Sequence, residues 1–273
     1  MGLRVNTNIA ALTAQRNLGA VSSRLSGNYA RLSSGLRIAT AADDAAGLGI
    51  SERMRAQIRS FGAAGRNAQD GVSLAQTAEG SLQEVSNILT RMRELAVQAA
   101  NGTLTSTDRT TLDTEFQALI QEVDRIATTA SFNGVSLLDG ASTGLSIQVG
   151  VNASETITIA LSDATASTLG IGTIDVTSVT NSNTALTTID AAIDSVTTAR
   201  GNLGAAQNRM TSAIASITNT RENLSAAESR IRDVDVALET ADLTRNSILQ
   251  QAAVSVLSQA NTQPQLALTL LQG

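Results

Sequence analysis

Carboxylates, hydroxyls, amides and arginines are the side chains that this sequence offers for catalysis. Its 273 residues include no His, Cys or Trp, and all 19 basic residues are arginines. The composition therefore excludes Ser-His-Asp and Cys-His units, zinc sites built on thiolates or on HExxH, and the lysine of a phosphate-binding P-loop. A hydrolase that works with carboxylates alone survives as a remote alternative. We expect a protein that is not an enzyme and that carries no cofactor and no metal.

Two acidic clusters come closest to a metal or acid–base site. Asp43 and Asp44 are adjacent, so their side chains diverge on a helix, and the pair fits the start of a helix, where the helix dipole favours negative charge. The second cluster comprises Asp233, Asp235, Glu239 and Asp242. It lacks the glycine and the spacing of an EF-hand loop. Its last three members share one helix face, which predicts a solvated or intersubunit charged surface rather than a divalent-ion site.

The charge of the chain disfavours a general nucleic-acid binder, because the net charge is −5. The charge is uneven: residues 1–66 hold nine arginines against three acids, and residues 67–200 hold five arginines against fifteen acids. The basic segment fits a solvated helix face, pairing with an acidic surface of another copy, or contact with a membrane or RNA.

The sequence gives no sign of a membrane span or of a cleaved secretory signal. No run approaches the roughly 18 apolar residues that a span needs. Polar Asn6, Thr7 and Asn8 follow Arg4, where the apolar core of a signal peptide would begin. We therefore expect no membrane insertion and no signal peptide that is removed.

Small apolar residues at helical spacing dominate the rest of the sequence. In the C-terminal half, steps of seven give Ile189, Val196, Leu203, Met210, Ile217, Leu224, Ile231 and Leu238. Alanines fill most of the companion positions, so this is a heptad seam. It weakens at Arg245, and an unbroken helix over 189–241 would be roughly 80 Å long. Shorter seams of the same kind occur over 18–36, 75–99 and 112–126.

The stretch 140–185 has a different pattern. The helical period disappears, Ser, Thr and Gly become frequent, and apolar residues alternate in 145–149 and 156–161. This alternation predicts a small β-hairpin followed by an irregular loop. An exposed region for modification is the alternative. The fold class is therefore mainly α: a long antiparallel helical rod or coiled coil with a small β-hairpin region and with the two termini paired.

The ends of the chain need partners, because a helix with an apolar stripe has to pack on something. The first and last segments can pack on each other, and the apolar C-terminal end implies a contact between molecules. We expect the assembly seams to include Ile9, Leu12, Leu18, Val21, Leu25, Leu32, Leu224, Ile231, Leu238, Ile248, Val256, Leu266 and Leu270.

Short motifs follow one another in a fixed order at both ends of the chain. The N-terminal ones include Leu3-Arg-Val-Asn-Thr-Asn8, Arg31-Leu-Ser-Ser-Gly-Leu-Arg-Ile38, Asp43-Asp-Ala-Ala-Gly-Leu48 and Arg91-Met-Arg-Glu-Leu95. The C-terminal ones include Ser229-Arg-Ile-Arg-Asp-Val-Asp235, Asn246-Ser-Ile-Leu-Gln250 and Gln259-Ala-Asn261. Over about 1–140 and 186–273, this order of motifs resembles bacterial flagellin.

The resemblance implies a short, core-only flagellin without the variable outer domains. Residues 1–40 and 234–273 would form the coiled coil of the filament's inner tube. Residues 41–233 would form the outer-tube domain, with helices at about 44–100, 106–129 and 186–233 and the hairpin and loop at about 140–185. The family also contains members with a patch that activates an innate receptor, which corresponds to Arg91, Leu95 and Glu115.

The implied function is that of a structural subunit that polymerises into the helical flagellar filament used for swimming. Such a subunit would be exported unfolded, added at the filament tip and located outside the cell. Its partners would be further flagellin copies, alone or with related flagellins, and the hook–filament junction proteins, the filament cap and an export chaperone. Two alternatives are a junction protein and a secreted helical effector that inserts amphipathic ends into membranes.

Overall fold

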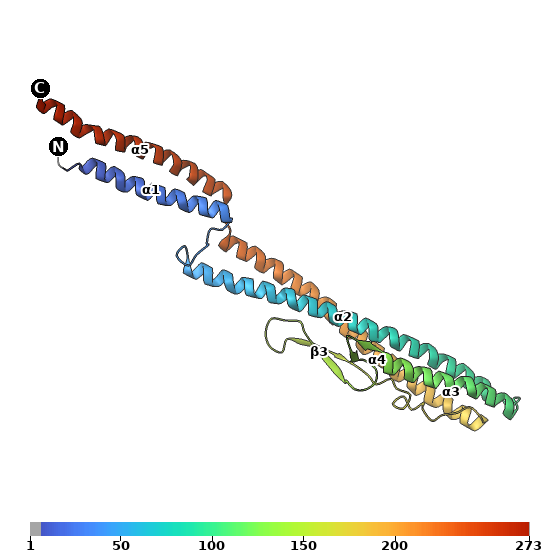
Figure 1. The fold of residues 1–273 in the computed structure, drawn as a ribbon. Helices are drawn as coiled ribbons and strands as arrows, with labels where there is room; N and C mark the ends of the chain where they lie inside the picture. The colour runs from blue at the N-terminus through green and yellow to red at the C-terminus, as the bar shows by residue number, and fades with distance from the viewer. Residues whose placement is uncertain (1–6, 273) are drawn as a thin grey trace. The chain divides into compact units, whose positions relative to one another are not determined.

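The computed structural model describes residues 7–272, with the backbone alone for residues 263–272. Its helices are α1 (Ile9–Ser34), α2 (Ala45–Ala99), α3 (Ser106–Thr129), α4 (Val179–Arg232) and α5 (Val236–Gln272). Its strands are β1 (Ser131–Phe132), β2 (Val135–Ser136), β3 (Gly144–Gln148) and β4 (Thr156–Ala160). The predicted fold class, mainly helical with a small β region and paired termini, is confirmed (Figure 1).

The chain divides into two compact units. Unit 1 contains residues 1–56 and 223–273, and unit 2 contains residues 57–222. The boundaries that the resemblance implies for the filament, 40/41 and 233/234, lie where the chain leaves one helix and enters the next, and they remain a prediction. The division of the structure falls within α2 and α4, because both helices continue from one unit into the other.

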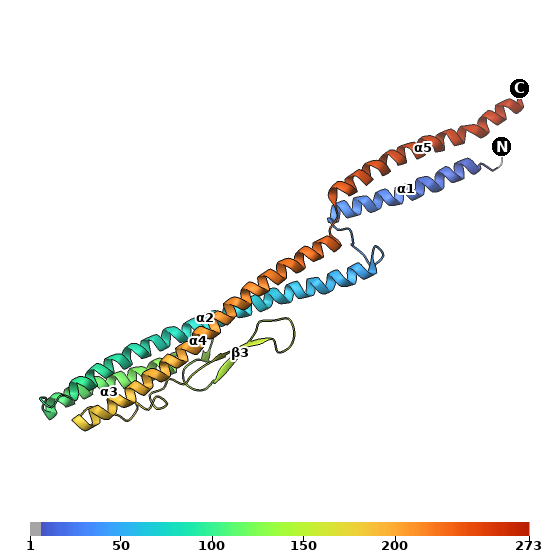
Figure 2. The same ribbon diagram turned by 180° about the vertical axis from the view of Figure 1, so that it is seen from behind.

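Unit 2 has an aliphatic core between α2, α3 and α4, which lie side by side in both views (Figures 1 and 2). Seven successive positions of the predicted heptad seam are buried on α4: Ile189, Ala192, Val196, Ala199, Leu203, Ala206 and Met210. The matching residues on α2 are also buried, among them Leu82, Leu89 and Met92, and Phe116 enters the core from α3. Narrow seams of small residues thus produce helix-on-helix packing.

The hairpin β3–β4 packs its apolar side onto this core. The two strands are antiparallel, with Leu145 opposite Ile159 and Ile147 opposite Ile157. Ile157 and Ile159 are buried, while their neighbours on β4 are exposed. The alternation of the sequence therefore describes these strands correctly.

A second, smaller hairpin joins β1 to β2 and was not predicted as strands. Its turn residues Asn133 and Gly134 both have positive φ angles, 50° and 79°. Asn-Gly favours such turns, because these residues tolerate the left-handed conformation at low cost. The dipeptide was the signal that could have revealed the hairpin.

Helix α4 begins earlier than the resemblance implies. It begins at Val179 rather than near 186, because the hydroxyl of Ser178 accepts from the Asn181 backbone N–H at 3.1 Å and caps a first turn that lacks apolar period. It ends at Arg232, close to the implied end at about 233, so the heptad period that runs on to 241 spans two helices. The Val234 N–H donates to the carbonyl of Gly35 at 3.0 Å, and Asp235 accepts from the Ala237 N–H at 3.0 Å, which starts α5.

Gly71 marks a close approach of three elements. A Cβ atom built on Gly71 would lie 2.6 Å from Met210 Sδ on α4 and 3.1 Å from Ile147 Cγ1 on β3. We expect Gly71→Ala to destabilise unit 2 by about 1–3 kcal/mol, because overpacking would push the hairpin off the helices. Thermal unfolding followed by circular dichroism would measure the loss.

The matched control is Gly80→Ala, about two and a half turns further along the same helix. Nothing lies within 4 Å of a Cβ built there. The control should stabilise the helix by up to about 1 kcal/mol, because alanine is the better helix former. Equal shifts for the two variants would contradict the close packing at Gly71.

Candidate assembly surfaces

Helices α1 and α5 form an antiparallel pair in unit 1. Figures 1 and 2 show the two helices side by side. Asn8 Nδ2, at the start of α1, donates to the carbonyl of Ala260 at 2.7 Å. At the other end of α1, Leu36 forms an antiparallel bridge with Asp233. The prediction that the first and last segments pack on each other is therefore confirmed.

The faces that these two helices present to each other are small and partly polar. On α1 the buried or half-buried positions include Ala11, Ala14, Leu18, Val21, Leu25, Asn28 and Leu32. On α5 they include Glu239, Leu243, Asn246, Gln250, Ala253, Leu257 and Ala260, each three or four residues from the next. Only Ala14, Leu25 and Ala260 of the described apolar side chains in this pair are fully buried. The pair thus buries little large apolar surface within one chain.

Large apolar side chains of α5 point away from α1. The exposed set on α5 is Val236, Leu238, Ile248, Leu249, Val254 and Val256, with exposures from 43% to 64%. At about 3.6 residues per turn, Leu238, Ala241, Ile248 and Ala252 fall on one stripe. We call these four residues, with Leu249 and Val256 beside them, the outer stripe. On α1, Ile9, Leu12 and Tyr29 are also more than half exposed.

The predicted seam residues therefore fall into two groups. Leu18, Val21, Leu25, Leu32, Leu224 and Ile231 are buried or half-buried in the chain itself. Ile9, Leu12, Leu238, Ile248 and Val256 are exposed. The side chains of Leu266 and Leu270 lie outside the described residues. The heptad spacing of α4 continues beyond the break between α4 and α5 and becomes the outer stripe of α5. A different set of residues on α5 faces α1.

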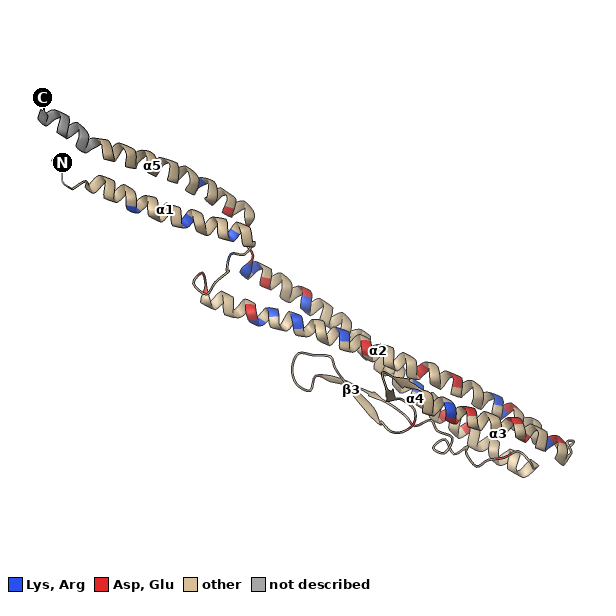
Figure 3. Cartoon of the chain, in the orientation of Figure 1, with Lys and Arg blue, Asp and Glu red and all other residues tan. Residues whose placement is uncertain are grey.

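The charge distribution of α5 reinforces this apolar character. No charged residue follows Arg245 in the sequence. Figure 3 shows charges along α2, α3 and α4, whereas the described part of α5 carries charges only near its beginning. The exposed Arg245 lies on the outer stripe between Ala241 and Ile248, and beyond Arg245 the stripe is apolar and uncharged. An exposed apolar surface of this kind marks an interaction site.

Unit 2 carries ion pairs at the positions of the predicted receptor patch. Arg91 Nε and NH2 donate to Glu115 Oε1 at 3.0 and 2.9 Å, and NH1 donates to Glu94 at 3.0 Å. These carboxylates, Glu115 first, raise the pKa of Arg91. Leu95 is 1% exposed and belongs to the core. The structure thus places the two charged members on the surface and the leucine beneath it.

Several carboxylates of unit 2 are held in the ionised form. The hydrogen bond from Arg93, at 2.6 Å, lowers the pKa of Asp190. The side chain of Asn181 lowers the pKa of Asp175, with help from Thr177. A pKa that is lower in the folded than in the unfolded state stabilises the fold above the unfolded value, and this stability is lost as the pH falls through the folded value.

We therefore expect the melting temperature of unit 2 to be nearly constant from about pH 7 to pH 5 and to fall below about pH 4, where unfolded carboxyls begin to take up protons. Calorimetry across this range would measure it. Asp190→Asn should show a smaller fall on acidification than the parent chain. A melting temperature that rises below pH 4 would contradict the assignment.

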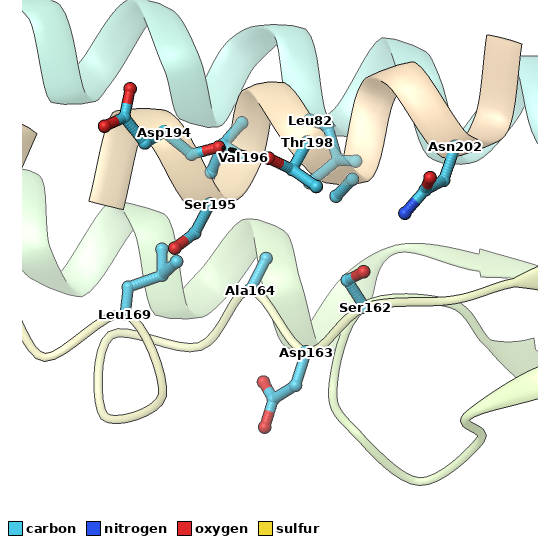
Figure 4. A pocket seen from close by; sticks show the side chains of 11 residues that line it. Leu82, Ser162, Asp163, Ala164, Leu169, Asp194, Ser195, Val196, Thr198 and Asn202 are labelled. Carbon is cyan, nitrogen blue, oxygen red and sulfur yellow. Dashed lines mark hydrogen bonds between the residues drawn. The ribbon is translucent and has the colours of Figure 1, made fainter. Parts of the chain in front are cut away.

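The best-formed hollow of unit 2 has a volume of about 410 Å³ and lies between α4, Leu82 of α2 and the segment 162–169 (Figure 4). Burial raises the pKa of the Asp163 carboxyl. Hydrogen bonds from Thr168 and Thr165 together lower the pKa by more than burial raises it, so the net shift is downward. Thr168 Oγ1 donates to Asp163 at 2.6 Å. This carboxylate is thus engaged in holding its own loop, and the hollow brings no general base to a nucleophile.

The two acidic clusters have structural partners. Asp44 accepts from the backbone N–H of Gly47 at 2.9 Å at the start of α2, as the sequence predicts. Asp235 caps α5, Asp242 pairs with Arg245, and Glu239 turns inward to Asn28. Within residues 7–262, His, Cys, Asp and Glu side chains do not gather in groups of three that could hold a metal ion.

None of the described helices is both long enough and apolar enough to cross a membrane. The fold and its exposed surfaces thus define a class: a helical structural protein whose terminal helices present apolar surface to partners. Residues 5–143 match the bacterial flagellin N-terminal helical region, and residues 186–271 match the bacterial flagellin C-terminal helical region. The chain belongs to the bacterial flagellin family, which is a family of structural proteins and not of enzymes.

Curated relatives match almost the whole chain. A flagellin of Halalkalibacterium halodurans is 48% identical over 98% of this chain and 99% of its own length. The flagellar filament 30.7 kDa core protein of Treponema maltophilum is 44% identical over 98% of this chain and 99% of its own length. The crystal structure of Bacillus cereus flagellin has a TM-score of 0.52 at 36% identity, and the match covers 60% of this chain and 94% of that one.

Proposed function

We propose that this chain polymerises into the helical flagellar filament, outside the cell, and that the outer stripe of α5 is a contact between copies. One observation carries the proposal: α5 turns a partly polar face toward α1 and keeps its large apolar side chains exposed. In a single chain this arrangement leaves apolar surface in water, which is unfavourable by about 25 cal/mol per Å². Contacts with further copies would remove it, and head-to-tail contacts that do not close produce a fibre.

The same feature explains why the ends would order on assembly. Fixing a backbone residue costs about 1–2 kcal/mol, and the α1–α5 pair buries few large side chains to offset this cost. We infer that the terminal helices are largely disordered in the free subunit and fold when copies add to the end of a growing filament. Addition would then be cooperative and directed to the tip.

Family membership supports further partners and a route of export. The proposal includes export in an unfolded state without a cleaved signal peptide, and contacts with hook–filament junction proteins, a filament cap and an export chaperone. The absence of cysteine suits such a route, because an unfolded chain without thiols cannot cross-link. The domain assignment proposed for the filament is 1–40 with 234–273 in the inner tube and 41–233 in the outer tube. Arg91 and Glu115 remain the proposed surface part of a receptor patch, with Leu95 beneath them.

The test is assembly of the purified full chain. Filament seeds or ammonium sulfate are added, the product is viewed by negative-stain electron microscopy, and far-ultraviolet circular dichroism is recorded before and after. Long tubes together with a gain of helix are the expected result. Monomer that persists at every salt and protein concentration would contradict self-assembly, and tubes without a gain of helix would contradict folding on addition.

A further inference from the structure

A group of polar side chains lies in the seam between α1 and α5, and two of its members are buried. Asn28 and Glu239 are each only 7% exposed. Asn28 Nδ2 donates to Glu239 Oε1 at 2.7 Å, and Asn246 Nδ2 donates to Asn28 Oδ1 at 2.9 Å. Arg31 NH1 lies 3.8 Å from the same carboxylate oxygen of Glu239. We call Asn28, Arg31, Glu239 and Asn246 the polar cluster.

The rest of the seam does little to fix how far α1 slides along α5. Alanines recur along it: Ala11 and Ala14 on α1, and Ala253 and Ala260 on α5. A slip by one heptad moves a helix by about 10 Å and returns the same face to the partner. The leucines of this face on α1, Leu18, Leu25 and Leu32, are also spaced by sevens. Such a slip therefore puts leucine in the place of leucine and alanine in the place of alanine, and apolar packing discriminates weakly between the two alignments.

The polar cluster does discriminate, because its members occur at one place on each helix. Asn28 lies between Glu239 and Asn246, which are one heptad apart, and it bonds to both. A slip in either direction separates Asn28 from Glu239, from Asn246 or from both. The slip therefore leaves a buried carboxylate or amide without its partner. Unpaired buried polar groups are costly, and single buried polar residues in helical seams are known to specify register.

We propose that the polar cluster sets the register of α1 on α5 and is thus a specificity-determining element of the terminal helix pair. It fixes which residues of α1 lie beside the outer stripe, and therefore the composite surface that a second copy meets. This last consequence rests on the proposed function, whereas the register belongs to the chain itself. The competing source of register is the backbone contact where the chain leaves α1, in which Arg37 N–H donates to Arg232 O at 2.7 Å and Leu36 pairs with Asp233.

Engineered disulfides can report the register cleanly, because the chain has no cysteine of its own. Contacts at Asn8–Ala260 and Asn28–Glu239 bracket the pair and place Ala14 beside Ala253. In the native register Ala14 lies between Ala253 and Ala260, as Asn28 lies between Glu239 and Asn246. Cysteines at Ala14 and Ala253 therefore report the native register, whereas cysteines at Val21 and Ala260 come together only after a slip by one heptad. Each pair is introduced into the full chain and into the triple variant Asn28→Leu/Glu239→Leu/Asn246→Leu.

The matched control is Gln250→Leu, which makes a half-buried seam position apolar outside the cluster. Oxidation is performed on soluble chain and on pelleted filaments that are diluted with the cysteine-free chain. Cross-linked monomers are then separated from dimers by gel electrophoresis. The two states separate the hypotheses. Failure to pellet speaks against the filament. Oxidation of the soluble chain traps the fraction in which α1 and α5 are paired, so the ratio of native to slipped cross-links still reports the register.

With the cluster intact, and in the Gln250→Leu control, the native pair should cross-link about tenfold more than the slipped pair. In the triple variant this preference should fall to about twofold or less, or the native cross-link should be lost, with the helix content unchanged. An undiminished preference in the triple variant would overturn the proposal and assign the register to the backbone contact. Absence of both cross-links in both states would overturn the α1–α5 pairing on which it depends.

Discussion

Replacing two residues of the outer stripe by glutamate, Leu238→Glu with Ile248→Glu, is expected to abolish filament formation without unfolding the chain. Both side chains are at least 60% exposed, so the charges remain in water in the free subunit. The free energy of unfolding of the variant should therefore stay within about 0.5 kcal/mol of the parent's. Between copies the same charges would be buried without partners, at a cost of several kcal/mol each. The concentration needed for assembly should rise by at least about a hundredfold.

The control uses the polar side of the same helix. Gln251→Glu adds a charge of the same sign at an exposed position that is three residues after Ile248 and outside the outer stripe. Sedimentation of seeded reactions over a range of protein concentrations would measure all three chains, with melting curves of the free subunits beside them. Normal assembly of the double variant would show that the outer stripe remains in water in the filament. A loss of assembly in the control as well would point to net charge rather than to this surface.

The sequence predicted the helices of unit 2 well, and the reason is the strength of their apolar period. From Ile189 to Met210 each heptad position is buried, so the pattern and the packing coincide. The apolar period did not predict the break between α4 and α5 at 233–235, because the contact that ends α4 is not local in sequence. The Val234 N–H bonds to Gly35, which lies almost two hundred residues away in the chain, and no window of neighbouring residues contains that contact.

The polar cluster was missed for a related reason. Tyr29 fits the apolar period of the first helix, but it is 58% exposed, and the adjacent Asn28 occupies the seam. A pattern of apolar residues cannot find a seam that is polar, and Glu239 was interpreted as part of a charged surface face. Inward-facing Asn and Glu become recognisable only when both helices are placed together. The outer stripe was found as a period, yet its direction, away from α1, required the structure.

A large loss of stability is expected when Phe116 is replaced, because its side chain is completely buried between the helices of unit 2. Phe116→Ala should remove about 3–5 kcal/mol of stability, because it deletes a large apolar side chain and leaves a cavity that rigid helices fill poorly. For a unit of this size, the melting temperature should fall on the order of 10 °C. Calorimetry, with the near-ultraviolet signal of the remaining aromatic residues as a second probe, would measure the change.

Val97→Ala on α2 is the control, since Val97 is 52% exposed in the same unit and should change the stability by no more than about 0.5 kcal/mol. The comparison also separates the roles of the two units. Phe116 is distant in sequence from the outer stripe and belongs to unit 2. Phe116→Ala should therefore still form filaments at temperatures well below its melting temperature. On heating, these filaments should disassemble at a lower temperature than filaments of the parent chain. Filaments that fail to form where Phe116→Ala is fully folded would show that unit 2 contributes to assembly through more than its stability.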